Sequence, residues 1–131
     1  MVRVCLVVLA LAFGGPVVAQ SESIRAVIGA QLKALEADDF AKAFSYASPT
    51  IKGMFRTPER FGAMVREGYP MVWRPSGVRF GPLREIDGRQ VQTVYLTDAQ
   101  GRDFEATYEM IEGASGWQIN GVAIAEADLS V

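Results

Sequence analysis

Residues 102–112 read RDFEATYEMIE, and this stretch carries the clearest structural signal in the chain. Apolar and polar side chains alternate along it at every second position. One face of an extended chain would carry Phe104, Ala106, Tyr108 and Met110. The opposite face would carry Asp103, Glu105, Thr107 and Glu109. Because successive side chains of a strand point to opposite faces, this alternation predicts a β-strand with one buried and one solvated face.

Turn signals on either side divide the C-terminal half of the chain into four strands. Asp87-Gly88 is a strong signal for a two-residue hairpin, and glycine-containing turns occupy residues 98–101 and 113–116. We expect residues 125–131 to fray. Consecutive strands joined by short turns predict an antiparallel meander. The predicted strands cover residues 78–86, 89–97, 102–112 and 117–124.

The N-terminal half carries helical signals instead. Residues 23–36 repeat apolar side chains at the spacing of one buried helical stripe. Asp38-Asp39 and Thr57 supply N-caps, and Pro58 suits a first helical position. The predicted helices cover residues 23–36, 40–46 and 57–67, with one further helical turn over 49–55. Pro70 and Pro75 predict an extended connector over residues 69–75.

Helices that precede a meander predict an α+β domain: three N-terminal helices packed on a curved four-stranded antiparallel sheet. A strongly twisted sheet wrapped around the helices forms a cone that can hold a cavity. The sequence contains no internal repeat and no linker long enough to divide it. We therefore expect one domain over residues 20–131, with an ordered core at about 23–124.

The first residues have the order of a secretory signal peptide, residues 1–19. Arg3 precedes an apolar run over residues 4–13, a Gly-Gly-Pro breaker interrupts the run, and small side chains follow. We expect cleavage between Ala19 and Gln20 and an exported protein, periplasmic or secreted. The apolar run is shorter than a membrane span, so no stable membrane anchor is expected after processing. An uncleaved anchor or a buried N-terminal helix is the alternative.

The chain has no histidine, and its single cysteine, Cys5, lies within the predicted signal peptide. These absences exclude Ser-His-Asp and Cys-His catalysis, the usual zinc and non-haem iron sites, and an internal disulfide in the processed protein. Nucleophile-elbow and phosphate-loop motifs are also missing from the sequence. We therefore expect neither a cofactor nor a bound metal.

Charge is spread unevenly over a chain whose formal net charge is −2. Residues 52–89 hold eight Lys and Arg against four acids, whereas residues 90–131 hold one Arg against seven acids. We interpret these as neighbouring segments whose charges offset each other on the sheet surface. A nucleic-acid groove would need clustered basic residues and a much higher isoelectric point, so no nucleic-acid partner is expected.

Several segments resemble known families. Residues 47–52 (ASPTIK), 68–75 (GYPMVWRP) and 116–122 (GWQINGV) resemble an uncharacterised exported bacterial family, domain-of-unknown-function family 4864. The order of elements, together with the passage over residues 32–44, resembles the wider nuclear transport factor 2-like, or cystatin-like, fold. That superfamily includes isomerase-like and dehydratase-like enzymes, binding domains and inert dimerisation modules. The resemblance therefore implies the fold and leaves the function open.

The resemblance also implies what an enzyme of this fold would need. Dehydratase-like members use a histidine, which this chain lacks. Isomerase-like members use a carboxylate base with a tyrosine and a protonated acid in the cavity. The inward face of the 102–112 strand offers Tyr108 but no acid, which argues against isomerase chemistry.

Two sets of residues are candidates for binding. Polar side chains on the predicted strands could line the cone interior: Gln92, Tyr95, Tyr108 and Asn120. Alternatively, they satisfy one another, the backbone or solvent. The connector could be a lid or a partner surface through Tyr69, Trp73 and Arg74, since these residue types dominate interface hot spots. The alternative is an apolar plug that packs a helix onto the sheet.

We expect a noncatalytic exported domain that binds a small apolar or amphipathic ligand in the cone, or that pairs with itself or another protein. One alternative is an isomerase- or hydrolase-like enzyme that uses Tyr and Asp/Glu for proton transfer; another is a self-associating structural module. An enzyme should place at least one acid inside the cavity with its pKa raised by burial. A large apolar patch on the outer sheet face would favour self-association.

Overall fold

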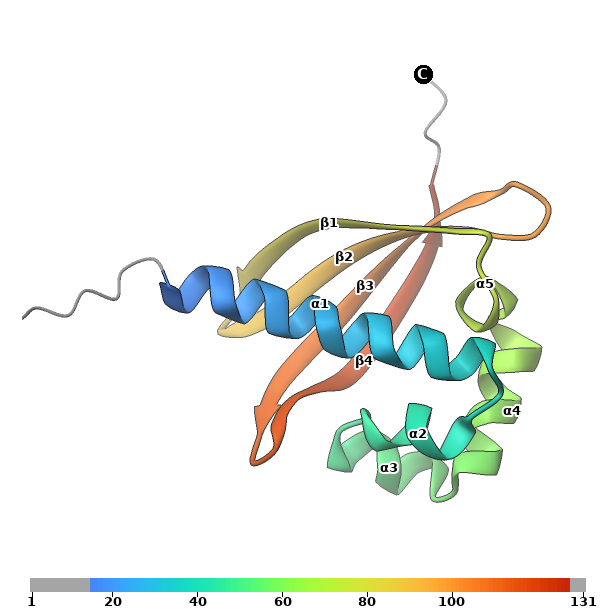
Figure 1. Ribbon diagram of the computed structural model, residues 1–131, viewed down its shortest axis with the longest axis horizontal. Helices are drawn as coiled ribbons and strands as arrows, with labels where there is room; N and C mark the ends of the chain where they lie inside the picture. The colour runs from blue at the N-terminus through green and yellow to red at the C-terminus, as the bar shows by residue number, and fades with distance from the viewer. Residues whose placement is uncertain (1–14, 128–131) are drawn as a thin grey trace, which may run out of the picture.

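The computed structural model describes residues 15–127 and shows an α+β domain in which helices pack against an open antiparallel sheet (Figure 1). The helices come first: α1 (Gly15–Glu36), α2 (Phe40–Ser45), α3 (Pro49–Phe55), α4 (Pro58–Gly68) and α5 (Pro70–Trp73). The strands follow: β1 (Gly77–Ile86), β2 (Arg89–Thr97), β3 (Asp103–Gly113) and β4 (Gly116–Glu126). The predicted fold class is confirmed.

The strands form one meander in the order β1-β2-β3-β4, and every neighbouring pair is antiparallel. At the first hairpin Asp87 and Gly88 have φ values of 51° and 79°, the positive values that a two-residue type I′ turn requires. The pairing of β1 with β2 shifts in register between Phe80 and Leu83. The pairing of β4 with β3 shifts at Asn120, which is an extra residue in β4. Such bulges bend and twist a strand, which helps to curve the sheet.

α1 crosses one face of the sheet, and α2, α3 and α4 gather near its C-terminal end (Figure 1). The core forms where α1 meets the sheet. From α1 it contains the fully buried Ile24, Ile28 and Leu35. From β3 it contains Phe104, Ala106, Tyr108 and Met110, all buried. The alternation predicted for this strand is therefore confirmed.

Three helices begin at side chains that cap them: Asp39 for α2, Ser48 for α3 and Thr57 for α4. Each cap accepts a hydrogen bond from the backbone N–H three residues later, at 3.2, 3.3 and 3.1 Å respectively. A proline follows the cap directly in α3 and α4, where no intrahelical donor is lost. The predicted caps at Asp39 and Thr57 are confirmed.

Most predicted boundaries lie within one residue of the observed ones, and three features differ by more. α1 begins at Gly15 and passes through the expected cleavage position, because Pro16 lies in the first turn, where proline is tolerated. The predicted extended connector over residues 69–75 is wrong for the same reason, because Pro70 occupies the first position of the short helix α5. β4 continues to Glu126 because its last residues pair with β3, so the expected fraying does not begin at residue 125.

Residues 1–14 of the expected signal peptide and residues 128–131 of the expected tail lie outside the described residues. Between residues 15 and 127, no helix has both the length and the apolar character to cross a membrane.

Candidate ligand-binding pocket

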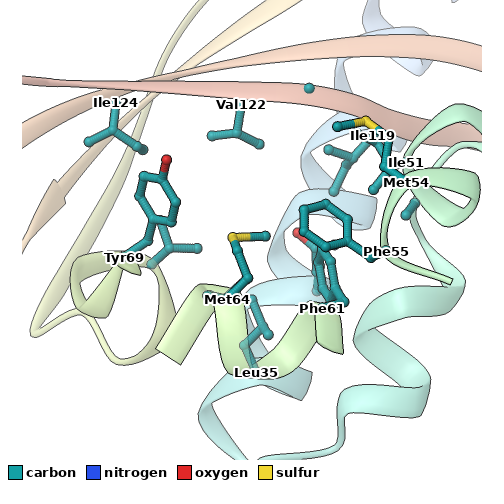
Figure 2. Close-up of a pocket in the computed structure, with 15 residues that line it drawn as sticks. Leu35, Ile51, Met54, Phe55, Phe61, Met64, Tyr69, Ile119, Val122 and Ile124 are labelled. Atoms are coloured by element: carbon teal, nitrogen blue, oxygen red, sulfur yellow. The ribbon is translucent and has the colours of Figure 1, made fainter. Parts of the chain in front are cut away.

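A pocket of about 270 Å³ opens between β4 and the helices α3, α4 and α5 (Figure 2). Gln31 and Leu35 of α1 line its inner side. The facing wall comes from β4 and contains Ile119, Val122 and Ile124. In Figure 2 the side chains of Met64 and Tyr69 point from the helical side toward β4. The pocket therefore lies between the helical layer and the last strand of the sheet.

α4 turns one apolar stripe toward this pocket. Phe61, Met64 and Val65 follow the i, i+3, i+4 spacing of a single helix face, and all three line the pocket. Phe61 is buried between Phe44 and Phe55, with ring centroids 5.3 and 5.8 Å away. This aromatic cluster joins α2, α3 and α4 beside the pocket.

Apolar side chains are exposed at the pocket mouth. Met54 is 66% exposed, and Tyr69 and Val122 are each 41% exposed. Figure 2 shows the Tyr69 hydroxyl turned toward β4 near Ile124. Single exposed apolar side chains are common on protein surfaces, but three around one opening are typical of a binding surface.

Among the residues that the structure describes, no charged side chain lines the pocket, and the polar side chains that do so are Gln31 and Tyr69. Such a lining contains neither a carboxylate nor an amine that could exchange a proton with a bound molecule. The arrangement can instead surround an uncharged, largely apolar molecule and offer it a small number of hydrogen bonds.

A polar network fixes α3 against β4. Ser48 Oγ donates to Asn120 Oδ1 at 2.7 Å, and Asn120 Nδ2 donates to Glu109 Oε2 at 2.7 Å. Arg89 forms an ion pair with the Glu109 carboxylate at 2.9 Å. The hydrogen bond from Asn120, aided by Arg89, holds the pKa of Glu109 below its ordinary value. Because Ser48 also caps α3, this network positions the α3 side of the pocket.

The structure does not bring the four predicted ligand-binding residues together. Gln92 and Tyr108 are paired neighbours on β2 and β3 and are fully buried on the inner face. Tyr95 lies on the outer face, where the Arg79 guanidinium is 4.4 Å from the ring centroid. Asn120 lies in the β4 bulge. None of the four lines the pocket, and their role in ligand binding stays a prediction.

The residues predicted as a lid or partner surface divide into two groups. Trp73 Nε1 donates to Asp38 Oδ1 at 2.8 Å, and Arg74 forms an ion pair with Oδ2 at 3.2 Å. The Arg74 guanidinium also lies 4.1 Å from the Trp73 ring centroid. These contacts fasten α5 to the turn between α1 and α2. Tyr69 alone of the three lines the pocket, and the lid or partner role stays a prediction.

The pocket residues of α3 were not found by sequence reasoning. Ile51, Met54 and Phe55 all line the pocket, although α3 has no buried residue. A seven-residue helix is too short for its periodicity to show which face is covered. Composition is the signal that could have identified these residues, since three large apolar side chains on so short a helix indicate an apolar surface that the helix does not bury.

Replacing Tyr108 with Phe is expected to raise the free energy of unfolding by about 1 kcal/mol. The Tyr108 hydroxyl is buried without a hydrogen-bond partner in the described part of the chain, and burial raises its pKa. Urea denaturation measures the change, with Tyr95→Phe on the outer face as the control that should leave stability unchanged. A loss of stability in Tyr108→Phe would mean that the hydroxyl finds a partner in solvent.

A comparison with protein-family models matches residues 18–130 to a family described as Domain of unknown function (DUF4864). A search of the curated proteins found no match, and a search of the solved structures found none either. The matched residues include every residue that lines the pocket. The chemistry of that pocket is therefore the guide to function.

Proposed function

We propose that this chain, which belongs to the family described as Domain of unknown function (DUF4864), binds a small uncharged apolar or amphipathic molecule. The pocket between β4 and the helices α3, α4 and α5 carries the proposal. Its lining is largely apolar and is uncharged, and its mouth exposes Met54, Tyr69 and Val122. Removing ligand and wall surface from water would contribute roughly 25 cal/mol for each Å² of apolar area.

Binding has better support than catalysis. An acid–base enzyme of this architecture would need a carboxyl group in the cavity with a raised pKa. No acid within residues 15–127 lines the pocket. Among the described residues, the acids with shifted pKa values are Asp98 and Glu109, and both pKa values are lowered. Both carboxylates therefore stay ionised at neutral pH. Neither of them belongs to the pocket lining.

We also propose that the fold belongs to the nuclear transport factor 2-like superfamily and that the protein is exported. Helices followed by an open, bulged four-stranded meander support the first proposal. The order of features in residues 1–19 supports the second. Cleavage after Ala19 would remove exposed residues such as Val17 and Val18 and leave the buried stripe of α1, which begins at Ile24, in place.

Replacing Val122 with Trp is expected to weaken the binding of n-octanol by about tenfold or more, because the indole would fill the pocket mouth. Titration calorimetry measures the affinity, and the methyl resonances of Met54 and Met64 report whether the alcohol enters the pocket. Ile86→Trp is the matched control, since Ile86 is an apolar residue of β1 that is 47% exposed and does not line the pocket.

The control variant should bind octanol as the unmodified protein does. Equal affinity in both Trp variants would place the bound alcohol outside this pocket and refute the assigned site. No measurable binding of octanol or of any similar neutral molecule to the unmodified protein would refute the proposed function itself.

A further inference from the structure

Gln31 is a polar residue on the buried inner side of the pocket. It stands on α1, is only 3% exposed, and lines the pocket. Its Nε2 donates to the backbone carbonyl of Ala43 in α2 at 3.1 Å. A carbonyl oxygen can only accept, so the Gln31 amide must present its NH₂ group to Ala43 and turn its oxygen elsewhere.

The Gln31 amide oxygen is neither hydrogen-bonded nor sealed off within the described residues. Among the described residues, the side-chain atoms that are sealed off without a hydrogen-bond partner are Gln92 Oε1 and Tyr108 Oη, and Gln31 Oε1 is not one of them. Within residues 15–127 the single hydrogen bond of the Gln31 side chain is the one that Nε2 donates. The oxygen is therefore not sealed off from solvent, and the residue that carries it lines the pocket while being almost completely buried.

We propose that the Gln31 amide oxygen selects the polar group of the ligand, so that the pocket takes a neutral aliphatic molecule with a hydrogen-bond donor, such as a medium-chain alcohol. This inference rests on the proposed function of the pocket. A ligand that fills the pocket displaces water from this acceptor, which is unfavourable unless the ligand brings a donor. A ligand hydroxyl supplies that donor while the alkyl chain contacts the apolar walls. At an interior packing density of about 0.75, the 270 Å³ pocket holds about 200 Å³ of ligand, which suits a short alkyl chain.

The same oxygen disfavours a fatty-acid carboxylate. A carboxylate offers acceptors only, and in the described part of the chain no Lys or Arg lines the pocket to pair with it. Burying that charge unpaired among apolar walls is costly. The Tyr69 hydroxyl does not impose the same selection, because Tyr69 is 41% exposed at the mouth and water can satisfy its hydroxyl.

Three probes of similar size test this inference by titration calorimetry at pH 7: n-octanol, heptyl methyl ether and octanoate. The ether is an isomer of octanol that keeps the oxygen but lacks the donor. We expect octanol to bind about tenfold more tightly than the ether, and octanoate also to bind more weakly than octanol. Ether or octanoate binding as tightly as octanol would overturn the inference and leave the proposed function standing. Failure of all three probes to bind would overturn both.

The Gln31→Met variant separates recognition from folding. Methionine has a similar length and volume but lacks the amide oxygen, so the ratio of octanol to ether affinity should fall from about ten to about one. The ratio does not depend on stability lost with the Ala43 hydrogen bond, because both ligands bind the same folded state. Gln100→Met, in an exposed turn, is the control and should keep the ratio. An unchanged ratio in Gln31→Met would overturn the inference, and the three probes on the unmodified protein decide it if this variant does not fold.

Discussion

Replacing Phe61 with Ala is expected to lower the free energy of unfolding by about 4 kcal/mol, within the range for truncating a buried aromatic side chain. Phe61 is 6% exposed and packs against the rings of Phe44 and Phe55, with centroids 5.3 and 5.8 Å away. These rings stand on different helices, so the space left by Phe61 cannot close without moving α2 or α3. Urea denaturation followed by circular dichroism measures the loss.

Two control variants bracket this result. Phe61→Leu keeps most of the side-chain volume and should cost about 1 kcal/mol. Val78→Ala removes an exposed side chain of β1 and should change stability by less than about 0.5 kcal/mol. A Phe61→Ala loss no larger than that of Val78→Ala would contradict the packing of α4 against the aromatic cluster.

Gly62→Ala is expected to lower the free energy of unfolding by about 2 kcal/mol, even though alanine is the better helix former. Gly62 is buried in α4, and a Cβ atom there would lie only 2.6 Å from Cδ1 of Phe40. The ring cannot simply turn away, because Phe40 packs against the core and Arg66 lies over it at 5.8 Å. Either α2 or α4 would have to shift.

Gly29→Ala in α1 is the matched control for this change. A Cβ atom at Gly29 meets no atom within 4 Å, so the variant should gain about 0.5–1 kcal/mol from helix propensity. Thermal or urea denaturation of the two variants should therefore give changes of opposite sign. Stabilisation by both substitutions would show that α4 does not approach Phe40 as closely as described.

Most of the fold could be predicted because its signals are local. The alternation in residues 102–112 predicted β3, Asp87-Gly88 predicted the first hairpin, and Thr57 predicted the start of α4, all of which the structure confirms. The error at α5 has a local cause as well. Pro70 was treated as a helix breaker, whereas a proline at the first helical position removes no intrahelical hydrogen bond.

The candidate site could not be predicted in the same way, because distant segments build its walls. Nothing in the sequence near Ile51 or Val122 shows that α3 will face β4. Tyr95 and Tyr108 were predicted to line the same cavity because both are tyrosines on predicted strands, but residue type does not show which face of the sheet a side chain occupies. Tyr95 pairs with the exposed Glu105 on the outer face of the sheet, whereas Tyr108 pairs with Gln92 on the inner face.

The sequence alone determines the order of helices and strands, the helix caps, the first hairpin and the absence of imidazole. These features depend on composition or on neighbours within about four residues. The pocket between β4 and the helices does not follow from the chain alone, and neither does the orientation of the Gln31 amide oxygen. Whether the Gln31 oxygen faces solvent, backbone or a pocket depends on where Ala43 and Val122 lie around it. The positions of these residues around Gln31 are set only when α1, α2 and β4 pack together.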